Sequence, residues 1–255
     1  MVGKAAPDRW SQFSSPHKNQ RGESSHGDWP RTLYHTPPPA SYLQAAQATL
    51  PVDRRLVDAC GQAALKIGGP GLTRLGVTSA LRGEGRSTVA LAMAALQSRE
   101  FSRRALLIDA DFENPTLGAM FGLAGEPGLA EVTTGELSID TAVREVAEGV
   151  AFLPAGVANK HRSRMVRELL STDLLDELSG LYEVAIVDLP PLLGTTDGPL
   201  LAKHFQNALL VVRAQVTPLA QVEEAVGMLS TKPFVLVNGI DSSLPRWLRR
   251  LVDRR

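Results

Sequence analysis

The stretch from Ala80 to Thr88 has the residue types and the spacing of a phosphate-binding loop. It reads Ala-Leu-Arg-Gly-Glu-Gly-Arg-Ser-Thr, and Gly83 and Gly85 permit a tight turn and a close approach of the backbone to a ligand. Where such a loop opens a helix, successive N–H groups and the positive end of the helix dipole converge on one point, which suits a polyphosphate. The predicted ligand contacts are Gly83, Glu84, Gly85, Arg86, Ser87 and Thr88, and the Ser87 hydroxyl is placed to ligate Mg²⁺.

Arg86 stands at the position where this kind of loop ordinarily has lysine. A guanidinium is planar, larger than an ammonium group, and donates hydrogen bonds in a fixed fork, so we expect it to bind phosphate from a different place. The loop cation contacts the β- and γ-phosphates, and its displacement should weaken transition-state stabilisation more than ground-state binding. Arg86 therefore predicts nucleotide binding with slow turnover.

Three aspartates lie at the ends of two apolar segments. Asp109 and Asp111 end the segment 104–111, where we expect them to alternate along one strand, point to one side, orient Mg²⁺ and polarise a nucleophile. Asp188 ends the segment 184–188 and is expected to hold a metal-bound water. The predicted catalytic set is Arg86, Asp109, Asp111 and Asp188, and the predicted metal ligands are Ser87, Asp109 and Asp188. The alternative is that these aspartates only cap helices or turns.

Alternating segments that read as strands and helices must position these residues. The pattern predicts strands over 75–79, 104–111, 150–154, 184–188, 208–213 and 234–237, and helices over 51–66, 89–96, 141–149, 171–181 and 218–230. This order predicts an α/β fold, a parallel β-sheet flanked by helices on both faces. A strand before the loop and a helix after it favour a phosphate site over an ordinary turn. The carboxyl ends of the strands should then gather the candidate residues at one edge.

The chain has 255 residues, 44% of them hydrophobic, which is enough for one sizeable core. We expect a disordered arm over 1–48, a P-loop nucleotide-binding domain over 49–245 and a basic tail over 246–255.

The 27 basic and 27 acidic residues cancel, so the chain has no net charge that would attract nucleic acid. Cys60 is expected to be a buried helix residue. No secretory or membrane-spanning apolar run is evident, which predicts a cytoplasmic protein.

The order of these motifs resembles the cytoplasmic domain of bacterial tyrosine kinases (BY-kinases), within the ParA/MinD group of P-loop ATPases. The resemblance covers about residues 72–240. It implies ATP and Mg²⁺ as cofactors, a Walker A motif at 79–88, Walker A′ carboxylates at Asp109 and Asp111, and the Walker B carboxylate at Asp188. It also implies that Asn238 contacts adenine, although a strand-end turn asparagine is equally consistent.

The same resemblance implies a role in capsule and exopolysaccharide biosynthesis or chain length, with a separate membrane-embedded co-polymerase as partner. Self-association is implied too, but residues 53–58 do not reproduce the Glu-x-x-Arg-x-x-Arg pattern that serves ring assembly in the family. The family phosphorylates a C-terminal tyrosine cluster, whereas the three tyrosines here are Tyr34, Tyr42 and Tyr182.

Two functions from different classes follow. The first is an ATP-binding regulator in which Arg86 impairs phosphoryl transfer. The alternative is an active tyrosine kinase or ATPase that acts on a partner or on Tyr34 or Tyr42. A ParA/MinD-like positioning ATPase is less well supported, because Leu81 stands where that branch carries a second lysine, although Arg82 is adjacent.

The basic tail over 246–255 suggests a membrane contact. As a helix it would group Trp247, Leu248, Leu251 and Val252 on one face, with arginines around the remainder. Such a helix could lie on an anionic membrane surface, at the inner face of the membrane. The alternative is a terminal helix docked on its own domain.

Overall fold

The computed structural model describes residues 50–52, 54–157 and 162–239. Their elements are α2 (Arg54–Ile67), η2 (Gly69–Gly71), β1 (Arg74–Ser79), α3 (Arg86–Phe101), β2 (Ala105–Asp109), α4 (Leu117–Met120), α5 (Leu129–Thr133), α6 (Ile139–Ala142), β3 (Arg144–Ala147), β4 (Val150–Leu153), α7 (Arg162–Ser171), α8 (Leu174–Gly180), β5 (Val184–Asp188), α9 (Asp197–Ala202), β6 (Ala208–Arg213), α10 (Leu219–Gly227) and β7 (Phe234–Asn238). The predicted arm over 1–48 and the tail over 246–255 lie outside the described residues.

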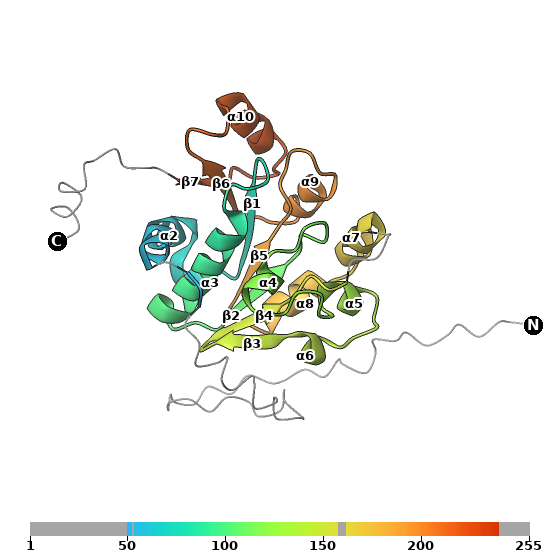
Figure 1. Cartoon of the computed structure of the whole chain (residues 1–255). Coiled ribbons are helices and arrows are strands. Elements are labelled where there is room, and N and C mark those ends of the chain that lie inside the picture. Colours follow the sequence, from blue (N-terminus) through green and yellow to red (C-terminus); the bar gives the residue numbers. More distant parts are fainter. Residues whose placement is uncertain (1–49, 53, 158–161, 240–255) are drawn as a thin grey trace, which may run out of the picture. The chain divides into compact units, whose positions relative to one another are not determined.

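A seven-stranded sheet in the order β3-β4-β2-β5-β1-β6-β7 forms the centre of the domain (Figure 1). Neighbouring strands from β4 to β7 run parallel, and only β3 runs antiparallel, against β4. The registers pair Asp109 on β2 with Asp188 on β5, and Val77 on β1 with the same Asp188. Because parallel strands end at the same edge, β1, β2 and β5 deliver their last residues to one place.

Helices cover both faces of the sheet, as the sequence predicts. Figure 1 shows α2 and α3 on one side and α7 and α9 on the other. Alternate strand residues serve the two layers: Leu107 and Ile186 pack in the cluster under α2 and α3, whereas Ile108 and Val187 pack in the opposite cluster. These strands are buried on both faces, which explains their near-continuous apolar sequences.

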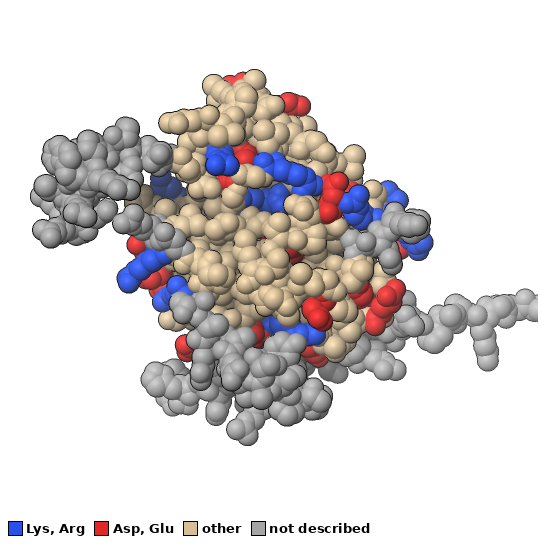
Figure 2. All heavy atoms as spheres, in the orientation of Figure 1, with Lys and Arg blue, Asp and Glu red and all other residues tan. Residues whose placement is uncertain are grey.

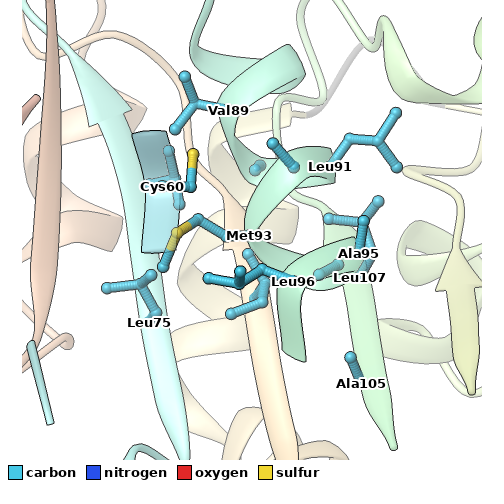
Figure 3. Packing of buried hydrophobic residues seen from close by; sticks show 14 of the residues in the cluster. Cys60, Leu75, Val89, Leu91, Met93, Ala95, Leu96, Ala105 and Leu107 are labelled. Atoms are coloured by element: carbon cyan, nitrogen blue, oxygen red, sulfur yellow. The ribbon is translucent and has the colours of Figure 1, made fainter. Parts of the chain in front are cut away.

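Helix α3 is the most buried helix of the described part of the chain, because α2 covers it from outside the sheet. Nine consecutive residues, from Val89 to Gln97, are buried, and Figure 3 shows Val89, Met93 and Leu96 packed among Cys60 of α2, Leu75 of β1 and Leu107 of β2. Burial raises the pKa of the Cys60 thiol to about 12, which confirms the expected buried role. Helix α3, which follows the phosphate loop, is thereby enclosed between α2 and the sheet.

Three predicted elements are wrong in detail. The helix expected over 141–149 is a short α6 followed by strand β3, which forms a hairpin with β4 through Gly149 at φ 70°. Good helix formers in this segment are overridden by pairing to β4 and burial of Val146 and Ala147. The strand expected over 104–111 ends at Asp109, so Asp109 and Asp111 do not alternate along one strand. The helix expected over 171–181 begins only at Leu174, after α7.

The described surface carries charges of both signs. Figure 2 shows basic and acidic side chains close together on one face, with uncharged surface between the groups. Within residues 50–239, setting aside the undescribed positions, no helix has the length and apolarity needed to cross a membrane.

Candidate nucleotide-binding site

The phosphate loop lies between β1 and α3, where the sequence predicts it. Gly83 has φ 81° and Gly85, the residue before the first turn of α3, has φ 90°. Both values lie in the left-handed region, which glycine adopts without the penalty that a β-carbon brings. A β-carbon on Gly85 would also clash with the Asn238 side chain. The N-terminus of α3 therefore faces the loop with its first N–H groups available to an anion.

Glu84 braces the loop with its side chain. The carboxylate is buried, and it accepts hydrogen bonds from Leu81 N–H at 2.6 Å, Arg213 N–H at 3.1 Å and the Thr217 hydroxyl. Arg213 ends β6, and Thr217 follows it. Because its side chain ties the loop to the end of β6, Glu84 can meet the predicted ligand only through its backbone N–H.

Asn238, at the end of β7, is a second brace. Its Nδ2 donates to the Glu84 carbonyl at 2.9 Å, and its Oδ1 accepts from Gly239 N–H at 2.8 Å. The structure therefore brings Asn238 to the phosphate loop across 154 residues of sequence. The adenine contact of Asn238 stays a prediction.

Arg86 turns into the protein rather than out over the loop. Its Nε donates to Asp188 Oδ1 at 2.7 Å, and one terminal nitrogen donates to Asp111 Oδ2 at 2.7 Å. The Arg86 side chain is 8% exposed, and both carboxylates are fully buried. Burial would lower the pKa of Arg86, but the charges of Asp188 and Asp111 raise it above the ordinary value. The loop cation thus binds the carboxylates that were predicted to serve the metal and the nucleophile.

A second arginine approaches Asp111 from the solvent side. Arg82 donates to Asp111 Oδ2 at 3.2 Å and also pairs with Glu113, and its side chain is 40% exposed. Arg162 lies 3.6 Å from the other oxygen of Glu113. The negative charge that Glu113 adds beside the loop is thereby matched by two cations.

Asp109 is held by backbone groups. Its Oδ1 accepts from Asp111 N–H at 3.1 Å, and its Oδ2 accepts from Leu117 N–H at 3.2 Å. Burial, together with the charge of Asp188, raises the pKa of Asp109 to about 8, and the two backbone donors only partly offset this effect. Its surroundings therefore favour the neutral form of the Asp109 carboxyl group.

The predicted metal ligands, Ser87, Asp109 and Asp188, meet at the carboxyl edge of β2 and β5, but most of their lone pairs have partners. Ser87 Oγ accepts from the Thr116 hydroxyl at 2.8 Å, and both Asp109 oxygens accept from N–H groups. Asp188 Oδ1 binds Arg86, whereas Asp188 Oδ2 is buried without a well-aligned hydrogen bond, although the Ser87 hydroxyl lies close enough to this carboxyl to help lower its pKa. Burial raises the pKa of Asp188, while the Arg86 charge lowers it. A guanidinium already fills the place between Asp111 and Asp188, so this donor set does not fit Mg²⁺ as it stands.

Sequence reasoning missed the groups that hold the loop and the acidic residues in place. Thr116, Arg213 and Thr217 contact Ser87, Gly83 or Glu84, yet no local motif marks them. Their roles depend on chain segments that meet only in the folded sheet.

The fold and the loop define this chain as a P-loop protein with a mainly parallel sheet. Curated relatives include YwqD, a tyrosine-protein kinase of Bacillus subtilis, 29% identical over 64% of this chain and 69% of its own length. ExoP, a succinoglycan biosynthesis transport protein of Rhizobium meliloti, is 31% identical over 63% of this chain and 20% of its own length. The solved kinase domain of VpsO is 26% identical and superposes with a TM-score of 0.62 over 72% of this chain and 95% of that domain.

These likenesses place the chain among particular P-loop proteins. It is similar in sequence to bacterial tyrosine-protein kinases, and it has the fold of their kinase domains. It spans about a fifth of the length of several of these relatives, among them EpsB of Ralstonia nicotianae. No protein-family model matches the chain.

Proposed function

We propose that this chain is an ATP-binding P-loop protein that regulates exopolysaccharide or capsule biosynthesis or chain length, with phosphoryl transfer impaired by Arg86. One observation carries the proposal: the Arg86 guanidinium is buried between Asp111 and Asp188, 2.7 Å from an oxygen of each. In phosphoryl transfer the loop cation must lie against the transferring phosphates, where charge develops. A cation held by two buried carboxylates is poorly placed for that task.

Nucleotide binding itself does not need Arg86. The backbone N–H groups at the start of α3 and the glycines at 83 and 85 supply the phosphate cradle. The loop is held in shape by Glu84 and Asn238. We therefore expect ATP to bind to the loop backbone but to turn over slowly, because Arg86 is paired with Asp111 and Asp188 and does not lie against the phosphates. The link to polysaccharide export rests on the kinase relatives and on ExoP.

An active tyrosine kinase or ATPase is the second candidate, and one observation favours it: Ser87, Asp109 and Asp188 do converge at one strand edge. For that function Arg86 must leave the carboxylates when nucleotide arrives, so that Mg²⁺ can take its place. The phosphate acceptor would then be a partner, or Tyr34 or Tyr42, which lie outside the described residues. A positioning ATPase of the ParA/MinD kind has less support, since Arg82, beside Leu81, is engaged with Asp111 and Glu113.

Three proteins separate these candidates: the unaltered chain, Arg86→Lys and Asp109→Asn. ATP binding is measured by calorimetry and turnover by phosphate release. We expect micromolar binding and slow turnover for the unaltered chain, and faster turnover for Arg86→Lys, because an ammonium on a flexible stem can reach the β- and γ-phosphates. Brisk turnover in the unaltered chain that only Asp109→Asn abolishes would support the active enzyme instead. Failure of all three to bind nucleotide would exclude both candidates.

The partner and the location complete the proposal. We infer a separate membrane-embedded co-polymerase as the partner, from the relatives named above, with the chain in the cytoplasm at the inner face of the membrane. Flotation with anionic liposomes, comparing the full chain with one that ends at Leu244, tests whether residues 245–255 contribute a membrane contact. Equal flotation of the two proteins would remove the tail from this proposal. Self-association stays a separate prediction, measured by light scattering with and without ATP.

A further inference from the structure

A fixed positive charge lies at the carboxyl ends of β2 and β5, the place where the sequence predicts Mg²⁺. The Arg86 guanidinium contacts one oxygen of Asp188 and one of Asp111, each at 2.7 Å. These are two of the three carboxylates at that edge, and the third, Asp109, is already bound by two N–H groups. The Arg86 guanidinium therefore already supplies a positive charge at this edge of the sheet, without a metal ion.

This guanidinium is poorly able to leave. Its side chain is 8% exposed, and its departure would strand two carboxylates that are 0% exposed. Charges buried without partners are strongly disfavoured in a protein interior, so the departing cation would have to be replaced at once. Arg82, the other arginine on Asp111, does not reach Asp188 by any described contact, and cannot substitute for Arg86 there.

One oxygen, Asp188 Oδ2, is buried without a well-aligned hydrogen bond and is the place where a metal would have to bind, although the Ser87 hydroxyl also lies near this carboxyl. The other oxygen of that carboxylate is 2.7 Å from Arg86 Nε. A divalent ion on Oδ2 would thus lie beside a fixed positive charge, and the mutual repulsion in a site with little water opposes its binding. The open oxygen is more compatible with a neutral hydrogen-bond donor than with Mg²⁺.

Another cation lies near the loop. Arg213, at the exposed end of β6, donates to the Gly83 carbonyl at 3.4 Å. With the N–H groups of α3, the Arg213 guanidinium places positive charge beside the loop. Part of the charge that Mg²⁺ ordinarily neutralises can be neutralised by the protein.

We propose that Arg86 replaces the divalent cation at this site, so that the chain binds ATP with the same affinity whether Mg²⁺ is present or not. This inference rests on the proposed nucleotide site and specifies its ligand. The site binds free ATP as readily as it binds the complex of ATP with Mg²⁺. A nucleotide-dependent regulator of this kind responds to ATP concentration and is indifferent to free Mg²⁺.

The first test uses the unaltered full chain. The dissociation constant for ATP is measured by calorimetry at matched ionic strength, once with excess Mg²⁺ and once with EDTA. We expect a ratio near one, that is, no coupling between metal and nucleotide, whereas coupled ligands ordinarily change one another's affinity by about 5- to 150-fold. A ratio of about ten or more in favour of Mg²⁺ would overturn the inference while leaving the nucleotide site intact. If ATP binds under neither condition, the proposed function itself fails.

The second test uses the metal alone. Mn²⁺, a paramagnetic stand-in for Mg²⁺, is titrated against the nucleotide-free protein and the free ion is followed by its electron paramagnetic resonance signal. We expect no stoichiometric binding to the unaltered chain. One tightly bound Mn²⁺ per chain would overturn the inference independently of any nucleotide measurement.

Two substitutions complete the design. Arg86→Lys places a shorter, single-point cation at the site, which cannot bridge Asp111 and Asp188 in the same way, so we expect ATP binding to become dependent on Mg²⁺. Arg74→Lys is the matched control, since Arg74 is ion-paired to Asp176 at the opposite end of β1 and should keep the ratio of the unaltered chain. An equal ratio for all three proteins that is near one would mean that Arg86 is not the cause, and would overturn the assignment to this residue.

Discussion

The arginine held between two buried carboxylates makes a quantitative prediction about stability. Arg86→Met keeps the approximate length and apolar stem of the side chain and removes its charge. Asp188 then loses its cation, while Asp111 keeps Arg82 at 3.2 Å. Breaking a buried ion pair from one side typically costs about 3–5 kcal/mol, because the remaining charge has no compensation.

Protonation of Asp188 sets a ceiling on this cost. The carboxyl can escape by taking up a proton, and the interval between its ordinary pKa of 3.8 and pH 7, at ~1.4 kcal/mol per unit, amounts to about 4 kcal/mol. At pH 5 the same reasoning allows only about 2 kcal/mol. Arg86→Met should therefore lower the unfolding free energy by about 4 kcal/mol at neutral pH, and by about half as much at pH 5.

Urea denaturation at the two pH values, followed by circular dichroism, measures both quantities. The control is Arg74→Met, whose partner Asp176 is 71% exposed and whose loss should cost at most about 1 kcal/mol. Adding Asp188→Asn to Arg86→Met should recover most of the loss, because an amide is neutral. If Arg86→Met is no more destabilising than Arg74→Met, the guanidinium is not buried between the carboxylates and the account of the site given above is wrong.

Three further predictions concern the loop and its neighbours. Glu84→Ala should destabilise the protein by about 2 kcal/mol and weaken ATP binding, because the N–H groups of Leu81 and Arg213 lose their acceptor. Urea unfolding measures the stability and calorimetry the binding. Glu84→Gln should retain part of both, since its amide oxygen can still accept a hydrogen bond. Gly85→Ala should cost at least ~1 kcal/mol from its left-handed φ and abolish ATP binding through its clash with Asn238, whereas Gly85→Ala combined with Asn238→Gly should recover stability more than binding. The pKa of Asp109 is raised to about 8, so the folded chain keeps a proton that the unfolded chain releases near 3.8. The unfolding free energy should therefore fall as the pH rises between these two values, by up to ~1.4 kcal/mol per pH unit. Urea denaturation at a series of pH values, without metal, measures this slope, and Asp109→Asn should flatten it.

The alternation of strands and helices could be predicted from the sequence because a parallel sheet buried on both faces leaves strong apolar runs. Leu106, Ile108, Ile186 and Val187 are all fully buried, and each lies in a segment that the sequence predicts as a strand. The hairpin of β3 and β4 was not predictable by the same reasoning, since the residues of β3 favour a helix in isolation. Pairing to β4 decides their conformation, and local propensity does not contain that information.

The positions of the candidate residues at one edge of the sheet could be predicted, but not the direction of the longest side chain among them. Gly83, Gly85, Asp109 and Asp188 all lie at the edge where their motifs predict. Arg86 was expected to reach phosphate, and it instead pairs with two carboxylates that come from strands later in the chain. A flexible side chain chooses its partner from the assembled surroundings, so a one-dimensional motif identifies the residue and leaves its orientation undetermined.

The hydrogen bonds that brace the phosphate loop also set an order of events during synthesis. Apart from Leu81, the hydrogen-bond partners of Glu84 lie 129 to 154 residues further along the chain, at the end of β6, just after β6 and at the end of β7. A ribosome will therefore have released β1, α3, β2 and β5 well before the loop can acquire its final shape. ATP cannot guide the early steps of folding in such a chain. ATP binding instead marks the end of folding, because only molecules in which β6 and β7 have joined the sheet have a fully braced phosphate loop.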